Sequence, residues 1–326
     1  MAEDCRLRHF RLTASAGDAA GVAALWNQAF AGHHGFFPIS ADLLWRRVIA
    51  LARFKPERFL VATIAGEIVG FLHHDEVREA SYTPAAVIKA FGVAPPYRRR
   101  GIGSALLAAA LADIKEGDLA FIDGGGAWPY SPFYATLIDG SERSGLFQNN
   151  TAALRLLARQ GFAPDRESIV MRRDLHDDIP AATIPSMLKA VEMVREGNSC
   201  WLDFVFRGWR LTDHDLCANN RPVTRAIYSR MDGVSDYSGR EIYAIFGVYT
   251  EEGSRRQGLA FCNLAAVLRR LRGLGAAEAE LHVYADNAPA VNLYRKLGFR
   301  EVARTVAMRK PMTKCCLAWL RSLWHG

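Results

Sequence analysis

The stretch from Leu281 to Phe299 reads LHVYADNAPAVNLYRKLGF and decides the interpretation of the whole chain. The pattern over Glu280–Ala285 predicts a β-strand, and the apolar spacing over Ala288–Leu297 predicts a helix. Gly298-Phe299 follows that helix directly. A short strand, a helix and a Gly-Phe pair form one unit whose counterpart can be sought elsewhere in the chain.

The chain contains such a counterpart. A helix predicted over Thr151–Arg159 leads to Gly161-Phe162, as the later helix leads to its own Gly-Phe pair. Similar predicted last strands then follow, SIVMRR over 168–173 and TVAMRK over 305–310. Landmarks that recur in one order indicate an internal duplication.

Each copy also has a short arginine- and glycine-containing loop, Arg98–Gly103 and Arg255–Ala260. Each loop lies between a predicted strand and a predicted helix. The strand covers Ala86–Val93 in the first copy and Glu241–Thr250 in the second, and the helix of the first copy covers Ser104–Ile114. A helix start offers unpaired N–H groups and the positive end of its dipole, and small residues let an anion approach the backbone. The repeated loops therefore predict two small anion sites, such as sites for pyrophosphate.

The two copies differ in length and at their starts. Arg255 follows Arg98 by 157 residues, whereas Gly298 follows Gly161 by 137, so the first copy has 20 additional residues. They fall between Gly124 and Asn150, in a loop that contains Tyr130 and Tyr134. In the first copy, the elements predicted before the loop are helices over 18–30 and 40–54 and a hairpin over 59–73. In the second copy, one helical segment is predicted at the start, over 185–195. We expect two domains, 1–176 and 177–326.

Composition excludes several classes of protein. Half of the residues are hydrophobic, which suits buried cores, and no apolar run is long enough to span a bilayer. The six cysteines and the paired histidines show no metal-ligand spacing, so we expect no metal. The net charge of +7 favours anionic partners, but its arginines cluster at the two loops, which argues against a nucleic-acid surface. The N-terminus lacks the apolar segment of a signal peptide, and we expect a cytoplasmic protein without membrane contact.

These motifs resemble those of the GNAT superfamily of N-acetyltransferases, whose pyrophosphate loop has the pattern Arg/Gln-x-x-Gly-x-Gly/Ala. The resemblance covers nearly the whole chain, and Leu281–Phe299 is its most specific part. It implies an α/β (α+β) chain with tandem GNAT folds. Each is a twisted mixed β-sheet flanked by helices, with a V-shaped splay between central strands where acetyl-CoA binds. The tandem arrangement resembles that of the mycothiol synthases, whose substrate cannot be carried over.

The resemblance also assigns roles in the second copy. Tyr294 would lie beside the sulfur and protonate the leaving thiolate as general acid, because a phenol of pKa about 10 is protonated at neutral pH. Asn287 would bind the cofactor arm. The strand end and the loop would hold the pantetheine arm, the thioester carbonyl and the pyrophosphate through Val248, Tyr249, Thr250, Arg255, Arg256, Gln257, Gly258, Leu259 and Ala260.

The first copy retains the loop but lacks the acid. Aligned on Gly-Phe, Asn150 corresponds to Asn287, and Leu157 corresponds to Tyr294. Leucine cannot donate a proton, so we expect the second copy to be catalytic, with Tyr130 or Tyr134 as a possible substitute acid in the first. The cofactor residues expected in the first copy are Val93, Arg98, Arg99, Arg100, Gly101, Ile102, Gly103 and Asn150.

A base must deprotonate the acceptor amine, and three residues are candidates. Glu241 is the first choice and His282 the second, with Glu280 on the same strand face as His282. The expected function is acetyl-CoA-dependent transfer to a primary amine of a small molecule or peptide by direct attack in a ternary complex. An acetyl-CoA sensor without turnover, or catalysis by the first domain, stays an alternative. The acceptor, the oligomeric state and the role of the Cys315-Cys316 tail have no readable signature.

Overall fold

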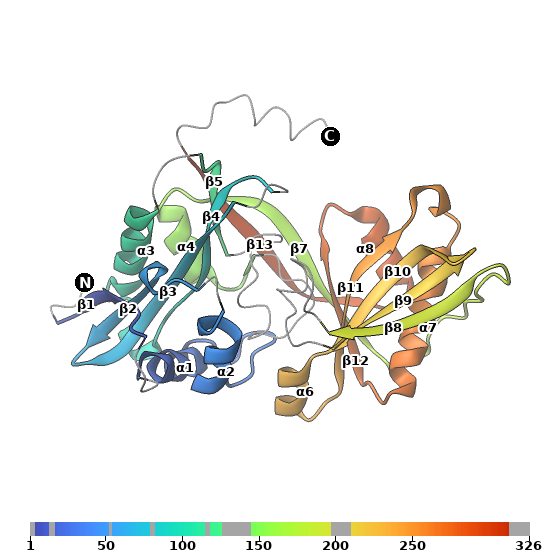
Figure 1. Cartoon of the computed structure of the whole chain (residues 1–326), viewed down its shortest axis with the longest axis horizontal. Helices are drawn as coiled ribbons and strands as arrows, with labels where there is room; N and C mark the ends of the chain where they lie inside the picture. Colours follow the sequence, from blue (N-terminus) through green and yellow to red (C-terminus); the bar gives the residue numbers. More distant parts are fainter. Residues whose placement is uncertain are drawn as a thin grey trace. The chain divides into compact units, whose positions relative to one another are not determined.

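The computed structural model describes residues 4–12, 17–51, 54–78, 82–114, 118–125, 145–196 and 210–312. The chain divides into two compact units, which Figure 1 shows with their elements labelled. Among the described residues, unit 1 contains the chain up to Arg166 and again from Val306 onward. Unit 2 contains Glu167–Thr305.

Unit 1 is built on a mixed sheet in the order β1-β2-β3-β4-β5-β13. The pair β4–β5 is parallel, and the other pairs along this order are antiparallel. A short strand, β6 (Leu146–Phe147), also pairs with β13. The strands of the main order are β1 (Arg6–His9), β2 (Phe59–Ile64), β3 (Glu67–Val77), β4 (Ala85–Val93), β5 (Phe121–Gly124) and the end of β13 (Arg300–Pro311).

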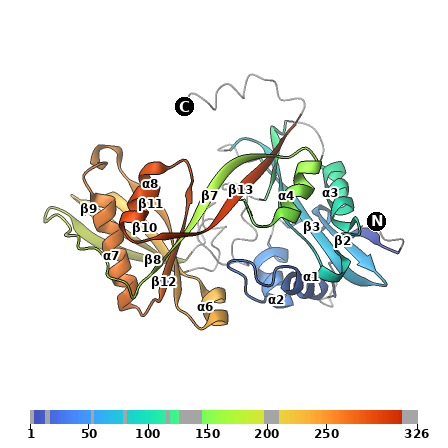
Figure 2. The same ribbon diagram turned by 180° about the vertical axis from the view of Figure 1, so that it is seen from behind.

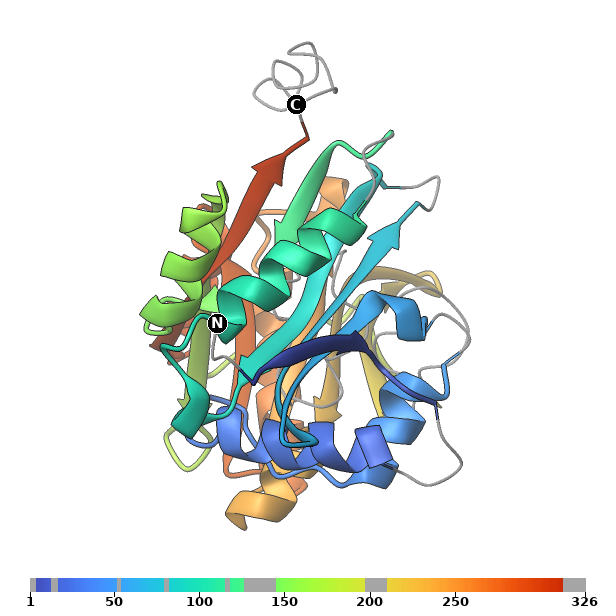
Figure 3. The same cartoon turned by 90° about the vertical axis from the view of Figure 1, so that its left-hand side faces the viewer.

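Helices cover both faces of the unit 1 sheet, as Figure 3 shows. On one face lie α3 (Ile102–Asp113) and α4 (Thr151–Arg159), whose apolar side chains share a core with β2 to β5. On the other face α1 (Gly17–Ala29) packs on β3 and β4 with a fully buried Trp26. The short α2 (Ala41–Leu44) starts at Ser40, whose hydroxyl accepts a hydrogen bond from the Leu43 N–H.

Unit 2 has the corresponding mixed sheet, in the order β7-β12-β11-β10-β9-β8. Helices α7 (Leu259–Gly273) and α8 (Ala288–Lys296) form one core with its strands, and α6 (Asp232–Ser238) precedes β11. The strands are β7 (Ala163–Asp174), β8 (Lys189–Glu196), β9 (Arg210–Ala218), β10 (Arg221–Arg230), β11 (Ile242–Thr250) and β12 (Glu278–Tyr284).

The two repeats exchange their last strands, β7 and β13, which can be followed in Figure 2. Strand β7 ends the first repeat but pairs with β12 of the second, from Ser168 opposite Tyr284 to Asp174 opposite Glu278. Strand β13 ends the second repeat, and its last residues pair with β5 of the first. The compact units therefore differ from a single division after residue 176, because each sheet is completed by a strand from the other repeat.

Most predicted elements agree with the structure, and two differ. The helix predicted over 40–54 is shorter, with α2 over Ala41–Leu44 and a π-helical segment over Trp45–Ile49. The helices at 102–113, 151–159, 259–273 and 288–296 and the hairpin of β2 and β3 are confirmed. The segment 185–195, predicted to be helical, is mostly the strand β8. The apolar spacing of this segment suggested a helix. Its backbone instead forms hydrogen bonds with β9 from Lys189 to Glu196, so tertiary pairing overrides the local preference. The loop with Tyr130 and Tyr134 and the Cys315-Cys316 tail lie outside the described residues.

Candidate active site

In each sheet the two parallel central strands pair over only a few residues, and the pairing ends before the first of the two strands does. In unit 2, β11 and β12 pair from Ile242 opposite Glu278 to Ala244 opposite Glu280, although β11 continues to Thr250. In unit 1 the β4–β5 pairing stops at Ile88 opposite Gly124, the last residue of β5, while β4 continues to Val93. The predicted splay between central strands is confirmed in unit 2. We call each separation the fork of its unit.

Backbone hydrogen bonds show which residues of β11 face the fork. The Tyr249 carbonyl accepts a bond from the Thr224 hydroxyl (2.8 Å), and the Glu251 N–H donates to β10 (2.9 Å). Backbone groups of alternate residues point to the same neighbouring strand. Thr250 therefore directs its N–H to the opposite side, where β12 has separated, while its carbonyl accepts from Arg255. A register shift between Phe246 and Tyr249 interrupts the alternation at Val248. For pairing with a bound chain, the geometry favours Thr250 over Tyr249.

The loop after each fork leads into a helix whose first N–H groups have no capping side chain. Gly258, the N-cap of α7, has φ +75°, and Arg256 has φ +61°. Gly101 and Arg99 take matching values of +80° and +63° before α3. Neither N-cap makes a side-chain capping bond, and neither helix has an acidic residue in its first turn. Both helix starts thus present N–H groups without an intrahelical partner.

The first arginine of each loop holds the loop to its own strand. Arg255 donates from Nε to the Thr250 carbonyl (3.1 Å), and Arg98 donates from Nε to the Val93 carbonyl (3.0 Å). Arg98 also donates to the Ala29 carbonyl at the end of α1 (2.9 Å). These contacts give the two side chains a structural role beside the expected attraction of an anion.

Two asparagines occupy equivalent helix caps. The Asn287 side-chain oxygen accepts from the Ala290 N–H (3.3 Å), and Asn150 does the same with Ala153 (3.2 Å). Each helix start is stabilised in this way. Because the oxygen serves the helix, the group that suits the expected contact with a cofactor arm is the amide nitrogen.

Tyr294 and Leu157 occupy the equivalent position in α8 and α4. A Cβ atom on Gly124, the last residue of β5, would lie 3.1 Å from the Leu157 side chain, so this position adjoins the fork in unit 1. Tyr294 is buried in the unit 2 core with its ring edge toward Phe299, at 6.0 Å between ring centres. A phenol in this position brings a proton donor where unit 1 has only hydrocarbon.

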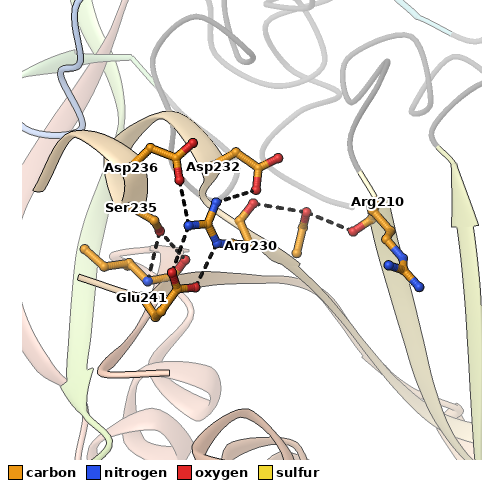
Figure 4. A network of polar contacts seen from close by, with 8 residues as sticks. Arg210, Arg230, Asp232, Ser235, Asp236 and Glu241 are labelled. Atoms are coloured by element: carbon orange, nitrogen blue, oxygen red, sulfur yellow. Dashed lines mark hydrogen bonds and ion pairs between the residues drawn. The ribbon is translucent and has the colours of Figure 1, made fainter. Parts of the chain in front are cut away.

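Glu241, the first choice as base, lies away from the fork. Figure 4 shows its carboxylate held by two hydrogen bonds from Arg230, each 2.8 Å long. Arg230 also binds Asp236 (2.7 Å) and Asp232 (3.0 Å). Arg230 holds the pKa of Glu241 below its usual value, which makes this carboxylate a weaker base. Glu241 also precedes β11, whereas the fork opens at the other end of that strand. The geometry therefore favours a structural ion pair for Glu241, and the role of base stays a prediction.

His282, the second choice as base, lies at the fork. It is the next residue on its face of β12 after Glu280, at which the pairing with β11 ends. Its side chain is almost fully buried, with Nε2 3.6 Å from Oε1 of the fully buried Glu280. Tyr284 shares the face. The face is opposite α7 and α8, because the intervening Leu281 and Val283 belong to the core beneath those helices.

The same face carries an ionic cluster that sequence reasoning missed. Asp213 and Asp215 on β9 are buried and bind Arg195 (3.2 Å) and Arg225 (2.7 Å) respectively. The intervening His214 points to the other face and bonds to Asn263 of α7 (2.6 Å). Acidic residues at alternate positions of a strand were the available signal.

Two further findings concern the described residues. They contain no group of three or more histidine, cysteine, aspartate or glutamate side chains arranged to hold a metal ion. No helix among them is long and apolar enough to cross a membrane.

Comparison with known proteins gives one family. The family model described as "Acetyltransferase (GNAT) family" matches residues 21–122 and 193–299. A mycothiol acetyltransferase of Catenulispora acidiphila is 26% identical over 259 residues, covering 72% of this chain and 74% of the relative. Another, of Saccharopolyspora erythraea, is 26% identical and covers 74% and 82%.

Solved structures share the fold. A tandem GNAT protein from the clavulanic acid biosynthesis pathway superimposes with a TM-score of 0.67 at 18% identity, covering 94% of this chain and 98% of its own. A GCN5-related N-acetyltransferase from Sphaerobacter thermophilus gives a TM-score of 0.63 at 18% identity, covering 95% and 96%.

Proposed function

This chain belongs to the acetyltransferase (GNAT) family and carries its fold twice, and from that premise we propose that unit 2 transfers the acetyl group of acetyl-CoA to a primary amine. Family membership makes the chain an acyltransferase. The observation that carries the proposal is the combination found in unit 2 alone: an open helix start, a fork, and Tyr294 at the position adjoining it. The acceptor is a small molecule or a peptide.

The residues of unit 2 fit acetyl-CoA as donor. The N–H groups at the start of α7, from Gln257 to Ala260, bind the pyrophosphate. The backbone of Val248 and the N–H of Thr250 pair with the pantetheine arm on the side of β11 from which β12 has separated. An N–H in this strand also stabilises negative charge on the thioester oxygen. Acetyl-CoA thereby supplies an activated acyl group, and the chain supplies its orientation.

Two side chains then handle protons. His282 takes the proton that the amine loses as its nitrogen forms the C–N bond. Tyr294 gives its phenolic proton to the sulfur as the C–S bond breaks. Solvent restores both groups to their starting states, so the products are the amide and CoA. The reaction proceeds by direct attack in a ternary complex, without an acyl-enzyme.

Unit 1 has a different role in this proposal. Its loop matches that of unit 2 in backbone conformation, so it binds acetyl-CoA through the start of α3. Leu157 provides no acid. Unit 1 is therefore a domain that binds the acetyl donor without turnover. The alternative of an acetyl-CoA sensor then applies to unit 1 and not to the whole chain.

The charged groups on the sheet face of unit 2 that carries His282 favour a polar acceptor. Asp213 and Asp215 bring carboxylates, and Arg195 and Arg225 bring guanidinium groups, to the face that also carries His282. The related proteins named above are called mycothiol acetyltransferases, which is consistent with a small polar acceptor.

Titration calorimetry with acetyl-CoA, together with an acetylation assay on a panel of primary amines, tests the proposal. Gly258→Asp is compared with Gly258→Asn, because both residues tolerate positive φ better than most and only aspartate adds a charge. We expect two binding sites in the wild type, and Gly258→Asp to remove one site and all turnover. Gly258→Asn weakens that site less, and Gly101→Asp removes only the other site.

The outcomes separate the alternatives. Turnover that survives Gly258→Asp and is lost in Gly101→Asp would place catalysis in unit 1. Acetyl-CoA binding without turnover on any amine of a broad panel would favour the sensor for the whole chain. No detectable binding in the wild type would contradict the proposal itself.

A further inference from the structure

A buried ion pair stands beside His282 and includes a residue from the first repeat. Glu280 is fully buried, and its Oε2 accepts a hydrogen bond from Arg172 Nε at 2.7 Å. Its other oxygen, Oε1, lies 3.6 Å from His282 Nε2. One carboxylate thus lies between a guanidinium and an imidazole. Arg172 stands on β7, directly opposite Glu280 in the sheet.

The arginine makes this buried carboxylate tolerable and fixes its direction. An ionised carboxylate away from water is costly unless it is paired and hydrogen-bonded. Arg172 also reaches Glu278, with Nη1 3.1 Å from Oε2, so two carboxylates hold its guanidinium plane. With Oε2 occupied by the arginine, Oε1 is the oxygen turned toward the imidazole. At 3.6 Å the carboxylate acts on the ring through its charge, which favours the protonated imidazolium over the neutral ring.

Unit 1 provides an internal control. Arg309 lies 137 residues after Arg172, and Glu280 lies 157 residues after Asp123. These are the two spacings of the repeat, so Arg309 corresponds to Arg172 and Asp123 to Glu280. They form the corresponding pair, with Arg309 Nε 3.6 Å from Oδ2 of the fully buried Asp123. The position of His282, however, corresponds to Gly125. The arginine–carboxylate pair is therefore common to both units, and the imidazole occurs beside it only in the unit that carries Tyr294.

We infer that Arg172, contributed by the first repeat, is a positioning residue that acts through Glu280 to hold His282 ready to accept the proton of the acceptor amine. The inference rests on the proposed function for the role of that proton. Because β7 of the first repeat belongs to the sheet of unit 2, the proton acceptor of unit 2 then depends on an arginine from the other repeat.

Histidine NMR titration tests the inference without any acceptor. Protein labelled with ¹³C at histidine Cε1 is titrated, and the His282 signal is identified by its loss in His282→Gln. The charged and titratable groups around this part of the face are Glu278, Glu280, Tyr284, Arg172 and Arg240.

The two partners of the ion pair predict opposite shifts. Arg172→Met leaves the negative charge of Glu280 uncompensated, which favours the imidazolium and raises the pKa of His282 by about one unit. Glu280→Gln removes that charge and lowers the pKa by a similar amount. Arg172→Lys retains the positive charge and gives a smaller shift than Arg172→Met. Arg309→Met, the same change in unit 1, leaves the His282 signal unchanged.

Activity provides a second readout with the amine that the acetylation panel identifies. The ascending limb of kcat/KM against pH should move with the His282 pKa, upward in Arg172→Met and downward in Glu280→Gln. Equal losses of activity in Arg172→Met and Arg309→Met with no movement of the limb would overturn the inference and leave Arg172 as a packing residue. A wild-type His282 signal that does not titrate from pH 4 to 10 would also overturn it. Failure of acetyl-CoA to bind would instead count against the proposed function.

Discussion

The same face of the same sheet is used differently in the two units. In unit 1, α1 covers it, and its Trp26 packs near Phe71, which in turn stacks on Phe59 at 5.6 Å between ring centres. In unit 2, no described helix packs on this face as α1 does in unit 1, and Asp213, Asp215, Glu280 and His282 occupy it. Among the described residues, this face therefore carries an aromatic core in unit 1 and charged groups in unit 2.

The difference extends to the fork, where the two copies share geometry but not chemistry. Both helix starts have a glycine of positive φ and a matching arginine contact to the strand end. Only unit 2 adds a phenol and an imidazole, where unit 1 has Leu157 and Gly125. Conservation of backbone shape together with loss of proton-transfer groups is the expected result when one copy binds a ligand and the other also converts it.

The largest effect should come from making unit 2 resemble unit 1 at its acid. Tyr294→Phe removes the phenolic proton but keeps the ring against Phe299. We expect kcat to fall by about 10²–10⁴-fold, the usual contribution of a general acid, while the Kd for acetyl-CoA stays unchanged. Steady-state kinetics and calorimetry on the same preparation measure the two quantities. Wild-type turnover across the pH range would exclude Tyr294 as the acid.

A second change opens the closed face of unit 1. Trp26→Ala removes a fully buried indole beneath α1, and we expect the free energy of unfolding to fall by about 3–5 kcal/mol. Chemical denaturation measures this loss. Acetyl-CoA binding at unit 2 should persist under native conditions. Loss of both donor sites in a folded Trp26→Ala protein would show that the two units are not separable in function.

The smallest predicted effect, measured between pH 8 and pH 5, concerns the pH dependence of unit 1 stability. Burial lowers the pKa of His73 from 6.5 to about 3, while its ring stacks on Phe59. Because the unfolded chain takes up this proton more readily, stability is present above pH 6.5 and falls as the pH drops toward 3, at up to about 1.4 kcal/mol per unit. His74, whose pKa burial also lowers, adds to the slope.

His73→Phe isolates this contribution, because phenylalanine keeps the stacking and cannot be protonated. Unfolding curves at pH 8 and pH 5 should show a smaller stability difference for the variant than for the wild type. Equal differences in the two proteins would mean that His73 is protonated as readily in the folded chain as in the unfolded one.

Much of the fold could be predicted because its signals are local. Alternation and helical spacing located the strands and helices on both sides of each loop, and the repeat of Gly-Phe and arginine landmarks aligned the two copies. Which sheet a strand joins is not a local property. The segments around Ser168 and Thr305 were recognised as equivalent last strands, yet only pairing with β12 and β5 assigns each to the other repeat.

The site was predictable in part, for the same reason. The arginine- and glycine-containing loops depend on neighbouring residues, and each opens a helix as predicted, with a glycine of positive φ at the N-cap. The ranking of bases depended on distant residues instead. Arg230 neutralises Glu241, and Arg172 pairs with Glu280 beside His282, across separations that no sequence spacing indicates.

The exchange of last strands also bears on how the protein is made. A ribosome releases the N-terminal repeat first, and domains generally fold as they emerge. The sheet of unit 1 receives β13 only after the entire second repeat has been synthesised. Until then β5 has an open edge, which in a nascent chain is a template for pairing with the wrong strand. Synthesis of this chain should accordingly depend on chaperones, or on slow translation of the second repeat, more than two independent domains in tandem would.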